Sequence, residues 1–196
     1  MKKTLALILT VMLLCCACAE NGTYVSDSGL FSYQYPEGYI ALSSASIDEV
    51  LSDPDMKAVF DNAGVDVSAL KSTDGTLMEF LYTPDFSGNM NVITMPNTGI
   101  NMDYMIVLQD MFYSAYVEQY VALGAKEEDV AFLGFLEYGA NTYFGIKVQL
   151  WGVDMTQYVI CDDNGTMCTF TFSMMDEEAI STVLSSFTYA AAEAAA

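Results

Sequence analysis

Apolar residues recur along the chain with two different periods, and the switch between them predicts the order of the secondary-structure elements. Alternation of apolar and polar residues, with many aromatic and β-branched ones, is typical of β-strands. Eight segments have this pattern: 30–35, 39–42, 77–83, 90–95, 129–138, 141–151, 154–162 and 165–173. Because short links containing glycine or asparagine join the last four, we expect an antiparallel meander there.

Two short helices are expected between the second and third strands. The segment 46–49 has the form of a capping box, Ser-Ile-Asp-Glu. Asp53 followed by Pro54 is a second start signal, with proline at the first helical position. That second helix should end near Asn62, because Gly64 is a typical helix stop.

The longest helix is expected over 102–123. Its apolar residues recur every three or four positions, which predicts a wide buried stripe: Met105, Leu108, Phe112, Tyr116 and Tyr120. Polar residues gather on another side of the same helix: Asp103, Asp110, Ser114 and Glu118. We interpret the stripe as core, since methionine and aromatic stripes are far more often core than cofactor sites. A last helix, capped by Asp176, has the same spacing in four apolar residues: Ile180, Val183, Leu184 and Phe187.

This order of elements predicts an α+β fold, in which helices pack on the faces of a mostly antiparallel β-sheet. The segment 29–189 is long enough for a single domain with a proper core. The polar segment 18–28 is expected to be a tether that precedes this domain. The Ala-rich segment 190–196 is expected to prolong the last helix or to fray.

The N-terminal segment has the pattern of a secretory leader. Lys2 and Lys3 form a short positive start, and an apolar run from Leu5 to Leu14 follows. This run is shorter than the roughly 20 residues that span a bilayer. We therefore expect residues 1–17 to be a signal peptide rather than a membrane-spanning helix.

Three of the five cysteines lie within the "LLCCACAE" segment, where this leader ends. The segment resembles the lipobox of bacterial lipoproteins, in which a lipid-modified cysteine becomes the first residue of the mature protein. Ala17 is the small residue that the family pattern places before the modified cysteine, so Cys18 is the expected lipidation site. Cys16, with Leu13 three places before it, is the alternative. The resemblance implies an extracytoplasmic protein anchored to the cell membrane by lipid.

The composition is strongly acidic and excludes several partners. The chain has 26 acidic residues against six lysines, with a formal net charge of −20. Such a surface repels nucleic acid phosphates and anionic lipid headgroups, so membrane attachment has to come from the acyl chains. A high net charge also favours a soluble monomer.

The residue types that are missing argue against catalysis. The chain has no histidine and no arginine, which excludes His-based triads, His-ligated metals and bidentate arginine clamps. Ser68 and Lys71 match the Ser-x-x-Lys nucleophile motif, but the partner motifs of those enzymes are absent. We therefore expect no enzymatic activity, no cofactor, no metal site and no catalytic residue.

Two cysteines lie near each other in the sequence, on the last two predicted strands. If Asn164 and Gly165 form a two-residue turn, Cys161 faces Cys168 on paired strands. Two alternatives then remain for this pair, a cross-strand disulfide or two buried free thiols, since oxidation is permitted outside the cytoplasm.

Trp151 lies at the end of a predicted strand. We expect it to close the rim of the core, with an exposed platform for sugar or peptide as the alternative.

The "FSYQYPEGY" segment resembles the first hairpin of the PsbP-like fold, which occurs in photosystem extrinsic proteins and in DcrB-type envelope lipoproteins. The "CTFTFSMMDEEAISTVLSSF" segment is similar to the last strand and helix of that group. The resemblance implies a PsbP-like sandwich with a binding or scaffolding role for an envelope protein. A small-ligand-binding accessory lipoprotein for transport is the alternative.

Overall fold

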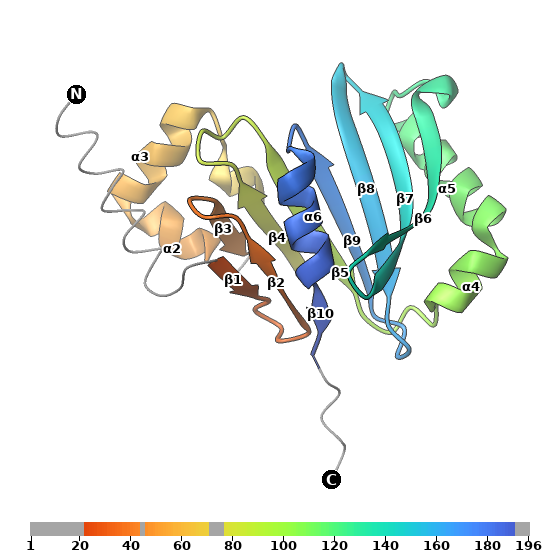
Figure 1. Ribbon diagram of the computed structural model, residues 1–196. Coiled ribbons are helices and arrows are strands. Elements are labelled where there is room, and N and C mark those ends of the chain that lie inside the picture. The colour runs from red at the N-terminus through yellow and green to blue at the C-terminus, as the bar shows by residue number, and fades with distance from the viewer. Residues whose placement is uncertain (1–21, 44–45, 71–76, 191–196) are drawn as a thin grey trace, which may run out of the picture.

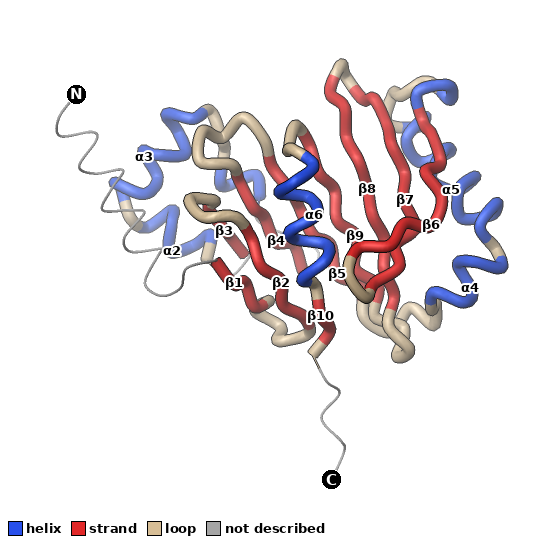
Figure 2. Tube along the Cα trace, viewed as in Figure 1, coloured by secondary structure: helices blue, strands red, loops and turns tan. Residues whose placement is uncertain are grey.

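The computed structural model describes residues 22–43, 46–70 and 77–190 of the chain. Ten strands form two antiparallel sheets (Figures 1 and 2). The small sheet has the order β1-β2-β10, with bounds Gly22–Val25, Phe31–Tyr35 and Thr188–Tyr189. The large sheet has the order β3-β4-β5-β9-β8-β7-β6, with bounds Ile40–Ser43, Leu77–Tyr82, Asn89–Met95, Met167–Ser173, Val153–Cys161, Asn141–Leu150 and Val130–Tyr138.

The helices lie against these sheets in separate groups (Figure 1). Their bounds are Ile47–Ser52 for α2, Pro54–Ala63 for α3, Met102–Val107 for α4, Gln109–Ala122 for α5 and Glu177–Ser186 for α6. Two 3-10 turns, η1 and η2, span Val67–Leu70 and Glu127–Asp129. The protein therefore has the predicted α+β fold, a mostly antiparallel sheet with helices on its faces.

The main core lies between one face of the large sheet, the small sheet and α6. Aromatic rings of both sheets meet there with Phe187, the residue after α6, whose ring centroid lies 5.5 Å from that of Phe31 and 5.1 Å from that of Phe170. The predicted apolar positions of the last helix are all buried: Ile180, Val183, Leu184 and Phe187. The Asp176 carboxylate accepts a hydrogen bond of 2.7 Å from the Ala179 amide, which confirms the predicted cap.

The opposite face of the large sheet carries two separate helical covers. The pair α4 and α5 packs on β6, β7 and β8 through a core that contains Met105, Tyr120 and Phe144. The pair α2 and α3 packs on β3 and β4 through a core that contains Phe60 and Phe80. The central strands β5 and β9 lie between these two covers in the sheet order.

The N-terminal part differs from the prediction in two respects. Residues 22–25, expected in the tether, form β1 and pair with β2, so the expected tether of residues 18–28 already contains a strand. The segments around Pro36 do not form a hairpin, because β2 belongs to the small sheet and β3 pairs with β4 in the large sheet. The turn at 36–38 instead carries the chain from one sheet to the other.

The helix starts agree with the sequence in one case and differ in another. The Asp53 carboxylate accepts hydrogen bonds from the Asp55 and Met56 amides, and Gly64 ends α3 with φ of 78°, as predicted. Ser46 makes no side-chain cap, because its hydroxyl donates to the Ser43 carbonyl over 2.9 Å instead. The expected capping box is therefore wrong.

The predicted long helix is broken at Leu108, whose φ and ψ are −108° and 25°. The break lets Met105 and Phe112 both face the sheet, whereas Leu108 turns outward and is 40% exposed. The predicted stripe is confirmed at the other four positions, which are buried or packed against the core. Leu108 itself was expected in the core, and that expectation is wrong.

Candidate binding surfaces

The inner side of α4 and α5 is fixed to the sheet by tyrosines as well as by apolar packing. The Tyr113 hydroxyl donates to the Val130 carbonyl over 2.9 Å, and its ring lies 5.7 Å from that of Phe132. The Tyr116 ring stacks on Phe144 at 5.9 Å. These contacts fix α5 to the sheet, and the buried Met105 packs α4 on the same core, so the outer side of both helices faces away from the sheet.

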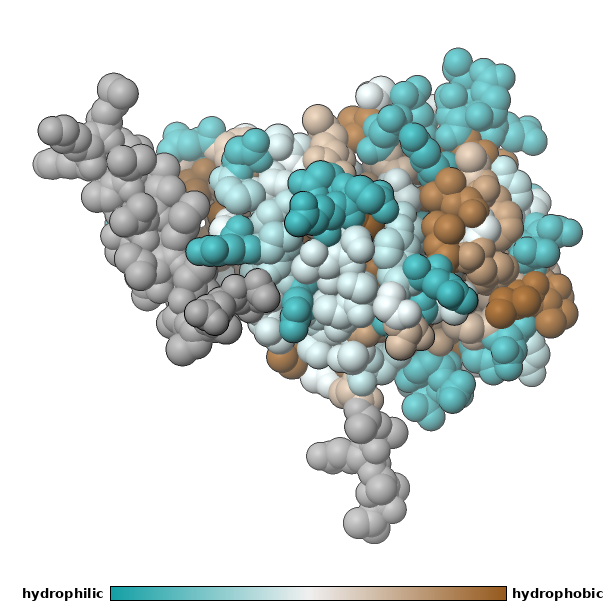
Figure 3. All heavy atoms as spheres, in the orientation of Figure 1, coloured by the Kyte–Doolittle hydropathy of each residue, from teal (hydrophilic) through white to brown (hydrophobic). Residues whose placement is uncertain are grey.

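That outer side is apolar around the break between the two helices. Five large apolar residues there are exposed, and we call them the α4–α5 outer face: Tyr104 (56%), Ile106 (46%), Val107 (77%), Leu108 (40%) and Met111 (57%). Hydrophobic surface gathers at the right of the molecule, over α4 (Figure 3). A cluster of this kind marks an interaction site more often than scattered single residues do.

Carboxylates flank this face. Asp103 lies three and four positions before Ile106 and Val107 on α4, so it is their neighbour on the helix surface, and Asp110 is in the first turn of α5, directly after the break. The segment 102–122 contains no lysine. The lysines of the described chain lie elsewhere and pair with local carboxylates: Lys57 with Asp61 at 2.6 Å, Lys126 with Glu128 at 3.6 Å and Lys147 with Asp154 at 3.9 Å.

Trp151 lies at the tip of the hairpin between β7 and β8. Its side chain is 80% exposed, so the expectation that it closes the core is wrong. Its φ is 53° and that of Gly152 is 81°, a pair of positive values that suits a two-residue hairpin turn. The indole lies near the end of α5, since a Cβ at Gly124 would be 3.6 Å from its Nε1 atom. A bulky residue rarely adopts this backbone conformation.

The middle of the large sheet, between the two helical covers, carries uncharged polar side chains. We call this set the central polar strip: Asn89, Asn91, Gln157, Thr169, Thr171 and Ser173. The pairing register places Asn91 opposite Thr171, and Thr171 opposite Gln157, in one row across β5, β9 and β8. Asn is depleted in strands, so two asparagines in the central strand β5 are unusual.

A hydrogen-bond chain orders one end of this strip. The Tyr120 hydroxyl donates to Oε1 of Gln157 over 3.1 Å. Nε2 of Gln157 in turn donates to the Thr171 hydroxyl over 3.1 Å. Both ends of the Gln157 amide are therefore committed, and the Thr171 hydroxyl still has its own hydrogen to donate.

Glu79, on β4, is a buried carboxyl on the other face of the sheet. It lies near Tyr24 and Tyr33 of the small sheet, whose rings stack at 5.1 Å. Burial raises the pKa of Glu79 to about 8, and the charge of Asp27 acts in the same direction. Three buried atoms here have no hydrogen-bond partner: both tyrosine hydroxyls and Oε2 of Glu79. Because Glu79 is only 4% exposed, its carboxyl lies inside the core and not on the surface.

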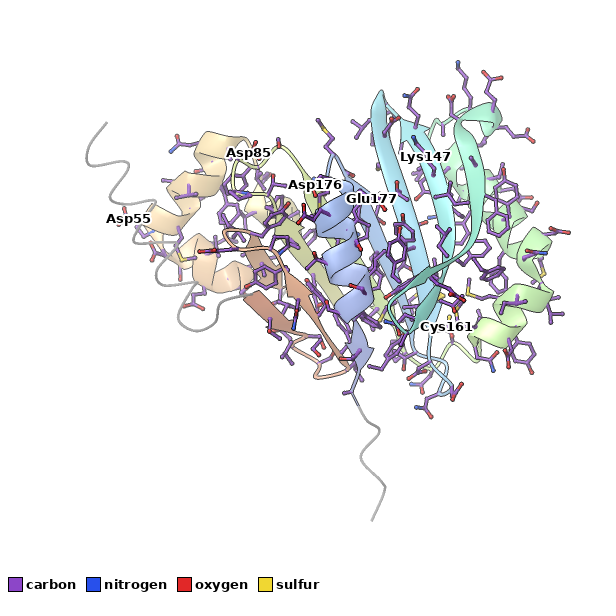
Figure 4. All side chains as sticks on the ribbon, viewed as in Figure 1. Asp55, Asp85, Lys147, Cys161, Asp176 and Glu177 are labelled. Atoms are coloured by element: carbon purple, nitrogen blue, oxygen red, sulfur yellow. The ribbon has the colours of Figure 1, made fainter. Side chains whose placement is uncertain are left out.

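Cys161 and Cys168 do not face each other. The register pairs Cys161 with Met167 and Ile160 with Cys168, so the predicted two-residue turn is wrong. Both cysteines are free and buried, with side chains on opposite faces of the sheet. Sγ of Cys161 lies 3.6 Å from Sδ of Met105 on α4 (Figure 4). Burial raises the pKa of each thiol to about 12, which keeps both thiols protonated and unreactive.

The turn between β8 and β9 spans residues 162–166 because the Asp162 carboxylate organises it. Oδ1 of Asp162 accepts hydrogen bonds from the Asn164 amide at 2.9 Å and the Thr166 amide at 2.7 Å. This Asx-type turn adds residues to the loop that the Asn-Gly pair alone suggested. The side chain of Asp162 is thus the signal that decides the register of the two cysteines.

The predicted lipidation sites, and one residue of the Ser-x-x-Lys match, for which no catalytic role is expected, lie outside the described residues. Cys18 and Cys16, the two candidate lipidation sites, belong to the segment 1–21, and Lys71 of the Ser-x-x-Lys match belongs to 71–76. In the part that the structure describes, no helix is both long and apolar enough to cross a membrane. The same described residues contain no cluster of three or more potential metal ligands.

Comparison with known proteins finds similarity among solved structures. No protein-family model and no curated protein matches it. A crystal structure from Bacteroides thetaiotaomicron is similar, with 12% sequence identity and a TM-score of 0.47. The match covers 88% of this chain and 50% of the other, so this chain spans about half of that protein's length. No residue role is transferred from it.

Proposed function

We propose that the chain is a lipid-anchored extracytoplasmic binding domain of the PsbP-like type, without enzymatic activity. The α4–α5 outer face carries this proposal, because Val107 and Met111 expose apolar surface on rigidly held helices. The leader and the cysteine cluster at 15–18 support the lipid anchor. An envelope protein is the partner that such an anchored surface would hold near the membrane.

The charge around this face indicates what the partner surface looks like. Asp103 and Asp110 flank the apolar residues, and no lysine lies on these helices. A partner with an apolar centre and lysine or arginine around it would satisfy both features. A second copy of this chain would bring more carboxylates to the same place, and nucleic acid would be repelled.

An exposed apolar face favours a protein partner over a small-ligand carrier. A carrier, the alternative function in transport, would enclose its ligand in a cavity lined mostly by apolar side chains. The apolar residues of the α4–α5 outer face are instead presented on the surface.

A photo-crosslinking amino acid placed at position 107 tests this function in cells. We expect a discrete protein adduct in the envelope fraction from position 107, and none from position 25, where Val25 is also exposed and apolar. The pair of changes Asp103→Lys and Asp110→Lys should weaken the adduct, because like charges would then meet. Equal adducts at 107 and 25, or none at 107, would contradict the proposal.

A further inference from the structure

The central polar strip is a surface separate from the α4–α5 outer face, and we propose that it binds an uncharged oligosaccharide. It lies on strands β5, β9 and β8. Asn89, Asn91, Thr171 and Ser173 are half-buried and reachable from solvent, whereas Thr169 is buried and Gln157 is buried beneath Tyr120 of α5. Its row Asn91–Thr171–Gln157 is bordered in the same register by Phe80 on one side and Ile146 on the other. The polar groups are therefore framed by the two apolar cores.

The donors and acceptors of this row are ordered before any ligand arrives. Tyr120 holds the Gln157 amide, and Gln157 holds the Thr171 hydroxyl, through the two bonds of 3.1 Å. The side chain of Asn91, directly opposite Thr171, is partly exposed and makes no hydrogen bond to another described side chain. A hydroxyl donor and a side-chain amide therefore lie side by side, the combination that sugar hydroxyls, which both donate and accept, can satisfy.

The backbone of this region cannot take part in recognition. Strand β5 pairs with β4 and β9, and β9 pairs with β5 and β8, so their amides and carbonyls are used within the sheet. An extended peptide would need a free strand edge for main-chain pairing. Recognition on this strip has to use side chains alone, which favours a ligand whose own surface is dense in hydroxyl groups.

The charge of the strip selects against ionic ligands. The chain carries 26 acidic residues, yet none of the six strip residues is charged. The surrounding negative field would repel uronic acids and phosphates, and a cation would find no carboxylate within the strip. An uncharged ligand is the class that remains.

Binding to an array of neutral and uronic-acid oligosaccharides tests the proposal, with the full chain as the probe. We expect binding to at least one neutral oligosaccharide and none to the acidic ones. Asn91→Ala and Thr171→Val should each reduce the affinity about tenfold or more, because each removes a hydrogen-bonding group and leaves its partner unsatisfied. Thr23→Val, on an exposed strand of the small sheet, is the matched control and should bind as the parent does.

Heteronuclear NMR with the bound oligosaccharide then locates the site. The side-chain amide signals of Asn91 and Gln157 should shift on titration, and those of Asn141, on β7, should not. Binding that survives both Asn91→Ala and Thr171→Val, shifts confined to other residues, or an array without any neutral binder would overturn the proposal. Thermal unfolding of each variant separates a lost contact from a lost fold.

Discussion

At the scale of single residues, Glu79 is a carboxyl that occupies a core position of β4, where an apolar side chain is usual. It shares the face of β4 that carries Leu81, inside the main core, and it pairs in register with Ser43 and Val92. A charged group there would be costly to desolvate, so the carboxyl stays protonated over most of the physiological range. The neutral carboxyl is less costly to bury beside the tyrosines of the small sheet than the charged one.

The raised pKa of Glu79 predicts how stability depends on pH. The folded-state pKa is about 8 against an ordinary value of 4.5, so the folded protein binds a proton that the unfolded chain releases. This contribution to the free energy of unfolding is complete below about pH 4.5, falls as pH rises towards 8, and stays lost above it. Each pKa unit corresponds to about 1.4 kcal/mol, so the loss amounts to a few kcal/mol.

Glu79→Gln should remove this dependence, because the amide is neutral at every pH. Urea unfolding at pH 5 and pH 9 measures the difference, and we expect a much smaller loss between the two for Glu79→Gln than for the parent. Glu137→Gln, at an exposed position of β6, is the matched control and should keep the parent's dependence. Parallel behaviour of the two variants would show that Glu79 is ionised in the fold.

At the scale of elements, α6 depends both on a local N-cap, Asp176, and on packing against the main core. Asp176 accepts a hydrogen bond from Ala179, and the helix it begins buries its apolar face against the main core (Figure 4). Loss of the cap would leave amide groups of the first turn unsatisfied.

Asp176→Ala should therefore lower the free energy of unfolding by about 1 kcal/mol, the usual value of such a cap. Asp176→Asn should retain most of the stability, since asparagine is an equally good N-cap residue. Urea midpoints at one pH compare the three proteins. If Asp176→Ala and Asp176→Asn lowered the free energy of unfolding equally, the stabilisation would come from the charge of Asp176 and not from its hydrogen bond.

The helix break at Leu108 shows what a periodic pattern misses at this scale. Apolar residues at 104, 106, 107, 108 and 111 surround the helix segment, so periodicity alone cannot decide which of them face the sheet. In the structure Met105 and Phe112 pack against the sheet, and the helix is broken between them at Leu108. The same choice leaves Val107 and Leu108 on the outside, where they form the proposed docking face.

At the scale of the whole molecule, the acidic body and the proposed lipid anchor act together. A surface of such negative charge gains nothing from anionic headgroups, so the acyl chains alone would hold the protein at the membrane. The first described strand, β1, begins only four residues after Cys18. A short connection of this length would keep the domain close to the lipid surface.

Cys18→Ala should release the protein from the membrane fraction and abolish incorporation of a labelled fatty acid. Cys16→Ala should keep both, since Ala17 directly precedes Cys18. Fractionation with metabolic labelling measures the two variants against the parent. If only the Cys16→Ala variant lost the label, the lipid would be attached to Cys16. If the parent and both variants all lacked the label, lipid anchoring would be contradicted.

Strands β2 to β9, most helix bounds and the α+β class were determined by the sequence itself, because alternation, proline, glycine and capping carboxylates act within a few residues. Asp53, Gly64 and Asp176 illustrate such local signals. The tertiary structure alone decided which sheet β1, β2 and β3 join, which way Leu108 and Trp151 face, and that Cys161 and Cys168 lie apart. It also brought Asn91, Thr171 and Gln157 into one row from three strands. Those outcomes depend on register and on competition between faces, which involve residues far apart in the chain.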